Sequence, residues 1–307
     1  MSRALLYDAF GGIDVLYLGN LPHLELAPGQ VRIHTVTAAL NPFDFKMRSG
    51  FIPGSAVFPH GVGNDFAGVV SEVTPEAQFF DGAPIRVGDH VLGFVDQTGV
   101  AEEIVVPASQ IVSKPHELSW EVAGGLAVAG LTADACLSAL EIYAVDVVGV
   151  SSAAGSVGQL FCQLAIAAGA QVIGSASSSN AEFLSGLGVI PVDYRKDLLE
   201  QIRVAAPSGL TKFQDNFGRP AIDMALSLGL PANQICSIVD HAAVAELGLA
   251  SPGKYLRSAS KLSVLAKRIA ARELSLEVQS VFALGDFVSA FELLETRHGR
   301  GKVVITF

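Results

Sequence analysis

The 307-residue sequence predicts an α/β protein with two parts of different character. Up to about residue 117, short runs rich in Val, Ile and Phe alternate with turn residues, as short β-strands do. From about residue 118, helical and strand patterns alternate, which implies a parallel sheet. Of all residues, 50% are hydrophobic and only 16% are charged, which suits a chain with a large buried core.

The first part is expected to fold as an irregular β barrel or sandwich, because its strands are short and its loops are long. Its predicted strands cover residues 30–37, 68–73, 90–95 and 103–106, with turns at 27–29, 51–54 and 88–89. The end of the chain returns to the same texture, with strands at 276–283 and 302–307 around a helix at 286–296. We therefore expect the C-terminal segment to complete the first domain.

The second part begins with a helical pattern over residues 119–140, which its glycines are expected to break. The following elements are predicted as strands at 146–151, 171–175 and 190–193, with helices at 157–168 and 180–187 between them. Further apolar strands are expected at 221–226 and 234–239. These patterns place one domain at 1–117 and 255–307 and the other at 118–254.

Charge and composition narrow the classes of partner. The formal net charge of −10 disfavours a nucleic-acid partner. Residues 147–181 carry no charged side chain, but glycines and serines interrupt the run, so no membrane-spanning helix is predicted. The N-terminal residues lack a signal-peptide pattern, and a cytoplasmic location is expected. Cys136, Cys162 and Cys236 form no C-x-x-C pair and the histidines lack ligand spacing, so no metal site is predicted.

The most informative segment is the glycine-containing turn between the predicted strand at 146–151 and the helix at 157–168. A dinucleotide fingerprint G-x-G-x-x-G aligns on Ala153, Gly155 and Gly158, with alanine in place of the first glycine. Gly155 would let the backbone approach a pyrophosphate, and Gly158 would let helix and strand pack closely. Free N–H groups at the helix N-terminus would supply the positive end.

Two other interpretations of this turn are open at this point. In one, the small residues only pack a tight strand-to-helix connection. In the other, Ala154-Gly155-Ser156-Val157-Gly158 is a nucleophile elbow with Ser156 as the nucleophile of a hydrolase. The acid and base that such an enzyme needs are available downstream in Asp223, Asp240, His241 and His298.

The end of the next predicted strand indicates which dinucleotide would bind. An NAD site has Asp or Glu about 20 residues after the central glycine, where it binds the ribose 2′-hydroxyl. Here the segment from Gly174 to Asn180 reads G-S-A-S-S-S-N, and no acid occurs before Glu182. Hydroxyls and free N–H groups suit a 2′-phosphate, so NADPH is favoured over NADH. The alternative is a serine-rich surface turn without a ligand.

Several ordered segments carry a resemblance to a known family. In the first part they are N-P-F-D-F-K-M-R-S-G at 41–50, G-N-D-F-A-G-V-V at 63–70 and V-G-D-H-V at 87–91. In the second they are A-G-L-T-A at 129–133, A-A-G-S-V-G at 153–158, V-D-Y-R at 192–195 and, in the tail, G-R-G-K-V-V at 299–304. The chain resembles the medium-chain dehydrogenase/reductase superfamily, specifically its zinc-free quinone oxidoreductases, the zeta-crystallin-like enzymes.

The resemblance implies a GroES-like β domain completed by the tail and a doubly wound Rossmann domain, with NADPH in the cleft between them. It also implies cofactor contacts from Gly155, Ser156 and Val157 at the pyrophosphate, Ser175, Ser177 and Tyr194 at the 2′-phosphate, and Thr132, Val239 and Asp240 near the nicotinamide. Asn41, Asp44 and Lys46 are the polar residues that it places nearest the substrate.

Departures from the wider family bear on mechanism. Zinc-dependent relatives have cysteine where this chain has Asn41, and a His-Glu pair where it has Asn64-Asp65. The catalytic metal is therefore expected to be absent, and carbonyl polarisation would come from hydrogen bonds. Many quinone oxidoreductases have tyrosine at the position of Lys46. For Asp44 the alternative role is a turn-capping carboxylate, and for Lys46 a surface lysine.

The resulting prediction is an NADPH-dependent, zinc-free oxidoreductase that transfers hydride to a quinone or to an α,β-unsaturated carbonyl compound. Two alternatives remain beside it: an NADPH-binding sensor or structural protein with little catalysis, and a serine hydrolase that uses Ser156. By resemblance, the protein is expected to be a homodimer that pairs its edge strand at 234–239.

Overall fold

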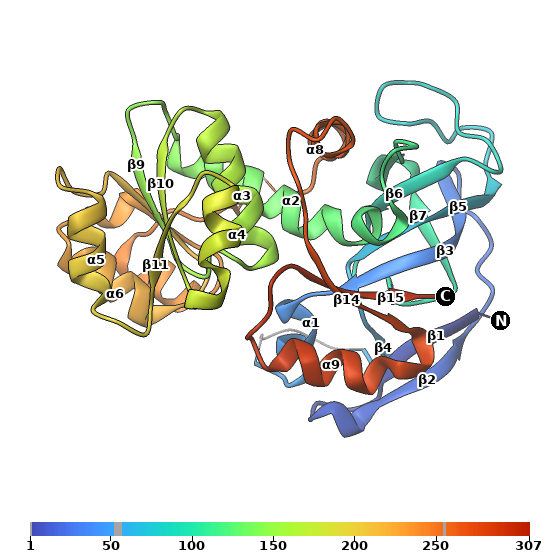
Figure 1. Cartoon of the computed structure of the whole chain (residues 1–307). Coiled ribbons are helices and arrows are strands. Elements are labelled where there is room, and N and C mark those ends of the chain that lie inside the picture. Colours follow the sequence, from blue (N-terminus) through green and yellow to red (C-terminus); the bar gives the residue numbers. More distant parts are fainter. Residues whose placement is uncertain (1, 52–56, 254–255) are drawn as a thin grey trace. The chain divides into compact units, whose positions relative to one another are not determined.

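The computed structural model describes residues 2–51, 57–253 and 256–307 (Figure 1). It confirms the α/β class and divides into two compact units, residues 1–128 with 257–307 (unit 1) and residues 129–256 (unit 2). The first division lies within α2 (Trp120–Leu140), whereas the sequence placed a boundary at 117 and 118. The predicted boundary at 254 and 255 and most of the turn at 51–54 lie outside the described residues.

Unit 1 is built on a sheet with the strand order β14-β15-β3-β5-β6-β8, in which β7 also pairs with β3. These strands are β3 (Gln30–Leu40), β5 (Asp65–Val73), β6 (His90–Phe94), β7 (Glu103–Pro107), β8 (Ile111–Ser113), β14 (Val278–Ala283) and β15 (Lys302–Thr306). Because β15 pairs antiparallel with β3, the C-terminal segment joins the β-rich first part of the chain, as predicted.

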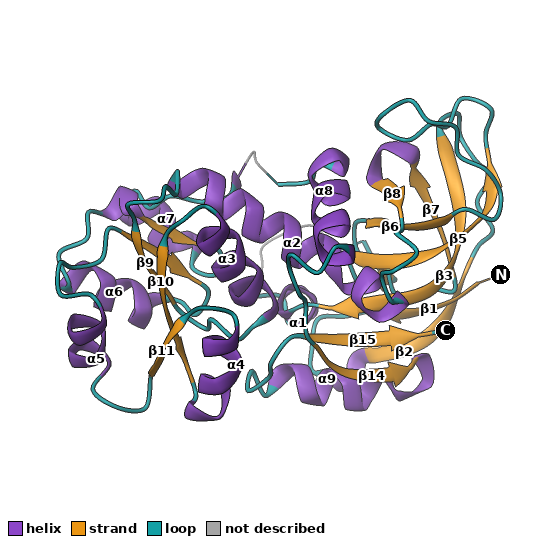
Figure 2. Ribbon diagram, turned by 45° about the horizontal axis from the view of Figure 1, so that its top comes forward, coloured by secondary structure: helices purple, strands orange, loops and turns teal. Residues whose placement is uncertain are grey.

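Unit 1 also contains a smaller sheet, the start of α2 and further helices (Figure 2). The sheet has the order β2-β1-β4, from β1 (Ser2–Tyr7), β2 (Leu16–Leu21) and β4 (His60–Gly61). The helices are α1 (Pro42–Arg48), α8 (Ala259–Ala270) and α9 (Phe287–Glu295). A core of Leu5, Leu40, Phe291 and Ile305, each at most 1% exposed, joins β1, β3, α9 and β15.

Unit 2 is a parallel sheet with the order β11-β10-β9-β12-β13. Its strands are β9 (Val147–Val150), β10 (Gln171–Ala176), β11 (Ile190–Asp193), β12 (Lys212–Asp215) and β13 (Ile235–Ser237). The helices between them are α3 (Ser156–Ala167), α4 (Ala181–Gly186), α5 (Leu198–Ala205) and α6 (Arg219–Ser227), and α7 (His241–Leu247) follows β13. In both ribbon views α3 and α4 lie on one face and α5 and α6 on the other, as in a doubly wound fold (Figures 1 and 2).

Two predictions for these helices were wrong. Residues 221–226 form part of α6 and not a strand: Gly218, at φ 123°, and Pro220 begin a helix, and Ala221, Ile222 and Ala225 are buried at helical spacing. The glycines of α2 do not break it. A Cβ at Gly124 would lie 2.8 Å from Thr37 Cβ, so glycine lets the helix approach β3 closely.

The outer edge of β13 is already occupied by the chain itself. Ala250 donates its N–H to the carbonyl of Ile235 at 2.8 Å and accepts the N–H of Ser237 at 3.2 Å. The N–H of Ile235 donates to Ala232. Ala250 of the same chain thus occupies the edge of β13 at which strand pairing between two copies was predicted, and the homodimer itself stays a prediction.

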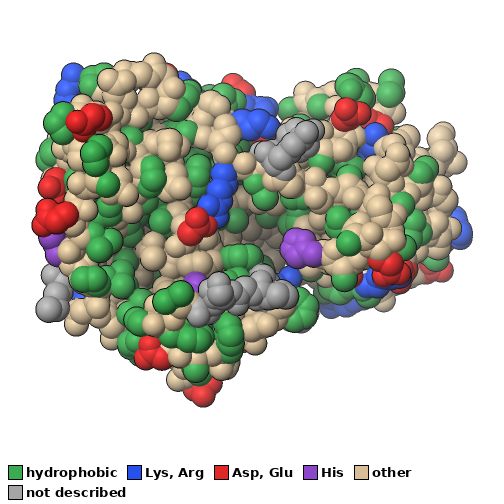
Figure 3. Space-filling view, turned by 180° about the vertical axis from the view of Figure 1, so that it is seen from behind, with side chains coloured by type: hydrophobic (Ala, Val, Ile, Leu, Met, Phe, Trp, Pro, Cys, Tyr) green, Lys and Arg blue, Asp and Glu red, His purple; other side chains and the backbone are tan. Residues whose placement is uncertain are grey.

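Only 16% of the residues are charged, and the surface of the protein reflects this composition. On the face in Figure 3, charged side chains are scattered among hydrophobic and uncharged ones. Among the described residues, α2 is the helix long and apolar enough to span a membrane, but 61% of its apolar window is buried inside the fold, as in a core helix.

All three cysteines are free and buried, and burial raises the pKa of Cys162 to about 12.

Candidate functional site: a glycine turn in unit 2 and a buried polar cluster in unit 1

The predicted glycine turn lies between β9 and α3, at the carboxyl edge of the parallel sheet, where such sheets bind ligands. Gly155 is the N-cap of α3, in extended conformation. The first N–H of α3 to find a backbone partner is that of Gln159, which donates to Gly155 at 2.9 Å. Within the described chain, the N–H groups of Ser156, Val157 and Gly158 have no partner, which leaves three donors for an anion.

Small side chains shape this turn. A Cβ at Gly158 would overlap the carbonyl oxygen of Ser152 and lie 2.9 Å from Ala153 Cα. A Cβ at Gly174 on β10 would lie 2.6 Å from the methyl group of Ala153. Both glycines are therefore required by close packing of α3, the turn and β10. The turn is a compact support for the row of N–H groups at the start of α3.

Three predicted 2′-phosphate residues lie at the carboxyl ends of neighbouring strands. Ser175 and Ala176 on β10 are in register with Val192 and Asp193 on β11, and Tyr194 donates its N–H to the carbonyl of Ala176. The hydroxyl of Ser177 lies 2.8 Å from that of Ser179. These strand ends bring hydroxyls and an exposed tyrosine together, and their contact with a 2′-phosphate stays a prediction.

Arg195 is a cation that sequence reasoning did not place in this group. Its guanidinium lies 5.7 Å from the centre of the Tyr194 ring and is more than half exposed. It also approaches Asp193 at 3.8 Å, too long for a tight ion pair. The signal was present in the sequence, since Arg195 directly follows Tyr194 in the V-D-Y-R segment. The structure thus places one positive side chain beside Tyr194.

Three residues assigned to the nicotinamide end have differing roles in the fold. Thr132 lies within α2 and is partly buried. Asp240 caps α7, because its carboxylate accepts the N–H of Ala243 at 2.9 Å. The N–H groups of Val239 and Asp240 both donate to the hydroxyl of Ser237, at 3.3 and 3.2 Å. The turn after β13 is therefore held from below by one serine.

Ser156 lacks the surroundings of a hydrolytic nucleophile. It occupies the first turn of α3, and in the described chain no histidine or carboxylate hydrogen-bonds its hydroxyl. Asp223 instead pairs with Arg219 at 2.9 Å, and Asp240 is the cap of α7. A serine hydrolase needs its nucleophile within reach of a base, so this turn has the geometry of an anion site and not of a nucleophile elbow.

In unit 1, two of the predicted substrate residues belong to a buried polar cluster. Asn41 donates through Nδ2 to Asp65 at 2.9 Å, and its Oδ1 accepts from Lys302 Nζ at 2.6 Å. Lys302 also pairs with Asp65 at 2.7 Å, and both side chains are at most 1% exposed. Asp65 accepts the N–H of Val128 with its other oxygen. The amide of Asn41 is thus engaged at both ends inside the fold.

Asp44 is the second member of this cluster and is also buried. Its Oδ2 accepts the N–H of Asn41 at 2.7 Å, and its Oδ1 accepts from the N–H of Gly63 at 3.2 Å and from Asn64 Nδ2 at 3.3 Å. Burial raises the pKa of Asp44 to about 7, although the donated hydrogen bonds oppose the shift. The carboxylate fastens the start of α1 to the turn before β5.

Lys46 differs from these two residues because it is only partly buried. It lies on α1, one turn after Pro42, and its Nζ is 5.9 Å from the centre of the Phe51 ring. Of the three predicted substrate residues, Lys46 is thus the one that is not buried.

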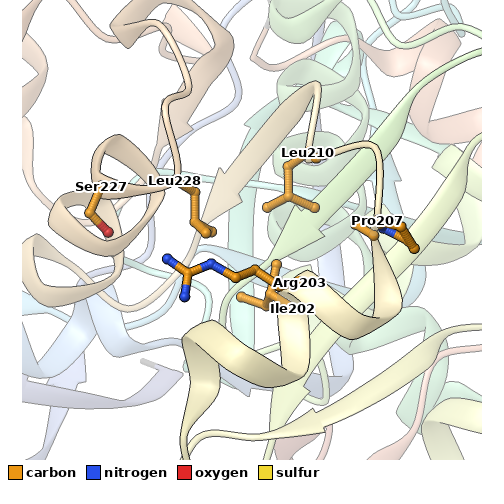
Figure 4. A pocket seen from close by; sticks show the side chains of 8 residues that line it. Ile202, Arg203, Pro207, Leu210, Ser227 and Leu228 are labelled. Carbon is orange, nitrogen blue, oxygen red and sulfur yellow. The ribbon is translucent and has the colours of Figure 1, made fainter.

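A hollow of about 200 Å³ occurs elsewhere in unit 2, between α5 and α6 (Figure 4). Arg203 points across it toward Ser227 and Leu228. Its lining includes Gly209 and Leu210, just before β12, so it lies at the amino end of that strand. Ligands of parallel sheets bind at the opposite, carboxyl edge. The hollow is therefore separate from the glycine turn.

Comparison with known families assigns both parts of the chain. Residues 27–116 match the model of the alcohol dehydrogenase GroES-like domain, and residues 143–305 match that of zinc-binding dehydrogenase. The second match covers more than half of the chain. It also raises the question whether this chain has a zinc site.

The residues of the buried cluster do not fit a catalytic zinc. Such a site takes three ligands from Cys, His, Asp and Glu, and here the corresponding positions carry Asn41 and Asn64 beside Asp65. The ammonium group of Lys302 already contacts Asn41 and Asp65. In the described chain, no group of three His, Cys, Asp or Glu side chains is arranged to hold a metal. We derive no step through zinc.

Individual relatives narrow the family. The chain is 29% identical over 99% of its length to an NADPH-dependent alkenal/one oxidoreductase of Arabidopsis thaliana, covering 79% of that protein. It is 26% identical to a quinone oxidoreductase of Pseudomonas aeruginosa over 99% of both chains. The structure of the quinone oxidoreductase from Coxiella burnetii matches with a TM-score of 0.88 and 30% identity, over 100% of this chain and 99% of that one. The protein is therefore an oxidoreductase of the medium-chain dehydrogenase/reductase superfamily and belongs to its zinc-free quinone oxidoreductase branch.

Proposed function

We propose that the protein is an NADPH-dependent reductase that transfers a hydride from the nicotinamide to a quinone or to the β-carbon of an α,β-unsaturated carbonyl compound. The observation that carries this proposal is the row of three N–H donors at the start of α3, contributed by Ser156, Val157 and Gly158. A cradle of backbone donors without a side chain over Gly155 suits a pyrophosphate.

The choice of NADPH over NADH rests on the ends of β10 and β11. Ser175 and Ser177 stand where an NAD site has a carboxylate that would repel a 2′-phosphate. Arg195, beside Tyr194, adds a positive charge to the same group. The name of the Arabidopsis relative, which includes NADPH dependence, supports the same cofactor for this chain.

When bound, NADPH supplies the hydride, and the protein has to hold the two reactants and polarise the acceptor. In unit 2, the turn from Gly155 to Gly158 would hold the pyrophosphate, while Thr132, Val239 and Asp240 are proposed for the nicotinamide end. In unit 1, we assign to Lys46 a hydrogen bond to the carbonyl oxygen of the acceptor. Positive charge there would stabilise the oxyanion that forms as the hydride arrives.

Asn41 and Asp44 have a different part in this proposal. Their polar groups are engaged with Asp65, Lys302 and backbone donors, so they act on the substrate through the position of α1. Because Lys46 lies on that helix, a change in either residue would move the proposed donor.

The test is the initial rate of NADPH oxidation with a panel of small quinones and enones. We expect turnover with at least one acceptor and a kcat/KM for NADPH at least tenfold above that for NADH. Lys46→Met is expected to lower kcat by about 100-fold to 1000-fold, the range over which one oxyanion donor acts. Asp14→Asn, an exposed change in the same unit, serves as the control and should leave kcat unchanged.

Two outcomes would contradict the proposal in different ways. Tight binding of NADPH without turnover of any acceptor would favour the alternative of a cofactor-binding sensor or structural protein. Equal kcat/KM for NADH and NADPH would remove the argument from Ser175 and Arg195. A cytoplasmic homodimer is also proposed, and sedimentation at twice the chain mass of 32.0 kDa would support the dimer.

A further inference from the structure

A buried carboxylate lies at the end of β12, in a strand that the sequence did not predict. Asp215 is 0% exposed. Its Oδ1 accepts from the hydroxyl of Ser151 at 2.9 Å and from the N–H groups of Phe217 and Gly218 at 2.9 and 3.0 Å. Its Oδ2 accepts from the hydroxyl of Ser237 at 2.8 Å. In the described chain no lysine, arginine or histidine pairs with it, so neutral donors alone compensate its burial.

The two serines lead from Asp215 to two different turns. Ser151 directly follows β9 and precedes the glycine turn. Its hydroxyl also accepts the N–H of Asn216 at 2.8 Å, and its carbonyl accepts from Asn216 Nδ2 at 2.8 Å. Contacts with the segment after β12 therefore hold Ser151 in place. Because Ser151 directly precedes the glycine turn, they also fix the start of that turn.

On the other side, Ser237 ends β13. While its hydroxyl donates to Asp215, it accepts the N–H groups of Val239 and Asp240. These are the residues proposed for the nicotinamide end of the cofactor. One carboxylate thus fixes, through one hydroxyl on each side, the starts of the β9–α3 and β13–α7 turns.

A second buried carboxylate lies at the other end of the same strands, where their amino ends meet. Asp146 immediately precedes β9 and is 6% exposed. It accepts the N–H of Tyr143 at 2.7 Å and the hydroxyl of Thr211 at 2.7 Å. Asp146 therefore fastens loops at the amino ends of the strands, where no ligand is expected. A purely structural role for both carboxylates would make their removal equivalent.

We propose that Asp215 is a positioning residue for the dinucleotide, which sets the phosphate turn through Ser151 and the nicotinamide-end turn through Ser237 without touching the cofactor. The inference rests on the proposed function, because it assumes that these two turns hold NADPH. It adds a residue that neither the glycine fingerprint nor the strand-end rule identifies.

The proposal predicts that the two arms can be separated by a truncated ligand. Adenosine 2′,5′-bisphosphate has the adenosine, the 2′-phosphate and one of the two pyrophosphate groups of NADPH, but lacks the nicotinamide half. Ser151→Ala should weaken the binding of both ligands. Ser237→Ala should weaken the binding of NADPH and leave that of adenosine 2′,5′-bisphosphate within twofold. General loss of stability would not produce this difference between ligands.

The experiment measures the Kd of both ligands for the full-length wild type and for Asp215→Asn, Ser151→Ala, Ser237→Ala and the matched control Asp146→Asn, well below the unfolding midpoint of each. Asp215→Asn should raise the Kd for NADPH at least tenfold, a loss of about 1.4 kcal/mol of binding free energy. Asp146→Asn should lower the unfolding midpoint but leave that Kd within twofold.

The inference would be overturned if Asp215→Asn bound NADPH as tightly as the wild type, or if Asp146→Asn weakened binding equally. If Asp215→Asn fails to fold, the contrast between Ser151→Ala and Ser237→Ala decides, and identical effects of these two on both ligands would also overturn it. Failure of the wild type to bind NADPH would contradict the proposed function itself, and is therefore distinguishable.

Discussion

The polar groups of the two units are arranged in opposite ways. In unit 1, Asn41, Asp65 and Lys302 are buried and satisfy one another, with every contact inside the fold. In unit 2, the N–H groups of Ser156 and Val157 at the start of α3 lack partners in the described chain. The first arrangement fastens strands together, whereas the second is complete only with a ligand. Proximity of polar residues to a family motif is therefore weaker grounds for a role than the presence of unused donors.

The two units also differ in their electrostatics: unit 1 uses charged side chains, whereas unit 2 relies mainly on backbone dipoles. In unit 1 an ion pair between two charged side chains holds β5 to β15. In a buried site, the attraction within such a pair mainly offsets the cost of removing both charges from water. Unit 2 offers backbone groups at a helix N-terminus that suit an anion, and Arg195 is the charged side chain proposed for a 2′-phosphate. The protein's net negative charge does not prevent phosphate binding, because local donors act at close range.

The largest expected effect concerns the unit 1 cluster. Lys302→Met leaves Asp65 buried without its cation, so the free energy of unfolding should fall by about 3–5 kcal/mol. Urea unfolding at pH 7 measures the change. The double variant Asp65→Asn/Lys302→Met should recover part of the loss, because no uncompensated charge remains. Unchanged stability of Lys302→Met would show that the cluster does not fasten unit 1.

The next effect concerns the unit 2 turn. Gly158→Ala inserts a methyl group against the backbone of Ser152 and Ala153, so the row of N–H donors should shift. We expect the Kd for NADPH to rise about 100-fold, or about 2.7 kcal/mol. Gly186→Ala on α4 is the control, because a Cβ there meets no atom within 4 Å. Equal binding by Gly158→Ala would mean that the turn is not the phosphate site.

A smaller effect is expected from the buried carboxyl group of Asp44. Its pKa of about 7 in the folded protein lies above its ordinary value of 3.8, so its contribution to stability is present below about pH 4 and is lost as the pH rises through 7. Relative to Asp44→Asn, the wild type should lose on the order of 2 kcal/mol of unfolding free energy between pH 4 and 8. Thermal unfolding across that range measures the difference. The exposed change Asp14→Asn should follow the wild-type profile, and a flat difference for Asp44→Asn would refute the shift.

The smallest effect concerns cofactor choice. Arg195→Gln removes the cation beside Tyr194 and should reduce the preference for NADPH over NADH about tenfold, or about 1.4 kcal/mol. The ratio of the two Kd values is the readout. Arg203→Gln removes an exposed arginine of the same unit from the hollow at the amino end of β12 and should leave the ratio unchanged. Equal ratios in all three proteins would assign the preference to the serines alone.

Local signals in the sequence were sufficient for the glycine turn. Gly155 and Gly158 are spaced as close packing requires, and the N–H row follows from the start of a helix after a buried strand. That the ends of β10 and β11 lie side by side also followed from local patterns, because neighbouring parallel strands place Ser175 and Tyr194 at the same end of the sheet. In such cases the residues that form the feature lie within a few tens of positions.

Other features depend on tertiary contacts that no local pattern encodes. β12 reads K-F-Q-D, with one apolar residue, and is buried because it lies between β9 and β13. Asp215 was missed with it, as were Ser151 and Ser237, which are separated from it by 64 and 22 positions. The short apolar run at 221–226 suited a strand or a helix equally, and Pro220 was the overlooked signal for a helix. The partners of Asn41 could not be found locally, since Lys302 is 261 positions away.

The distance along the chain between Asp65 and Lys302 has a consequence for synthesis. Residues are added at about 5–20 per second, so the 237 positions between this pair correspond to roughly 10–50 s. Throughout that time Asp65 lacks the ammonium group that compensates it, and β3 lacks its neighbour β15. Unit 2, by contrast, is continuous in sequence and can fold while the last strand is still being made. A nascent chain is thus able to form the parallel sheet of unit 2 before its β-rich unit closes.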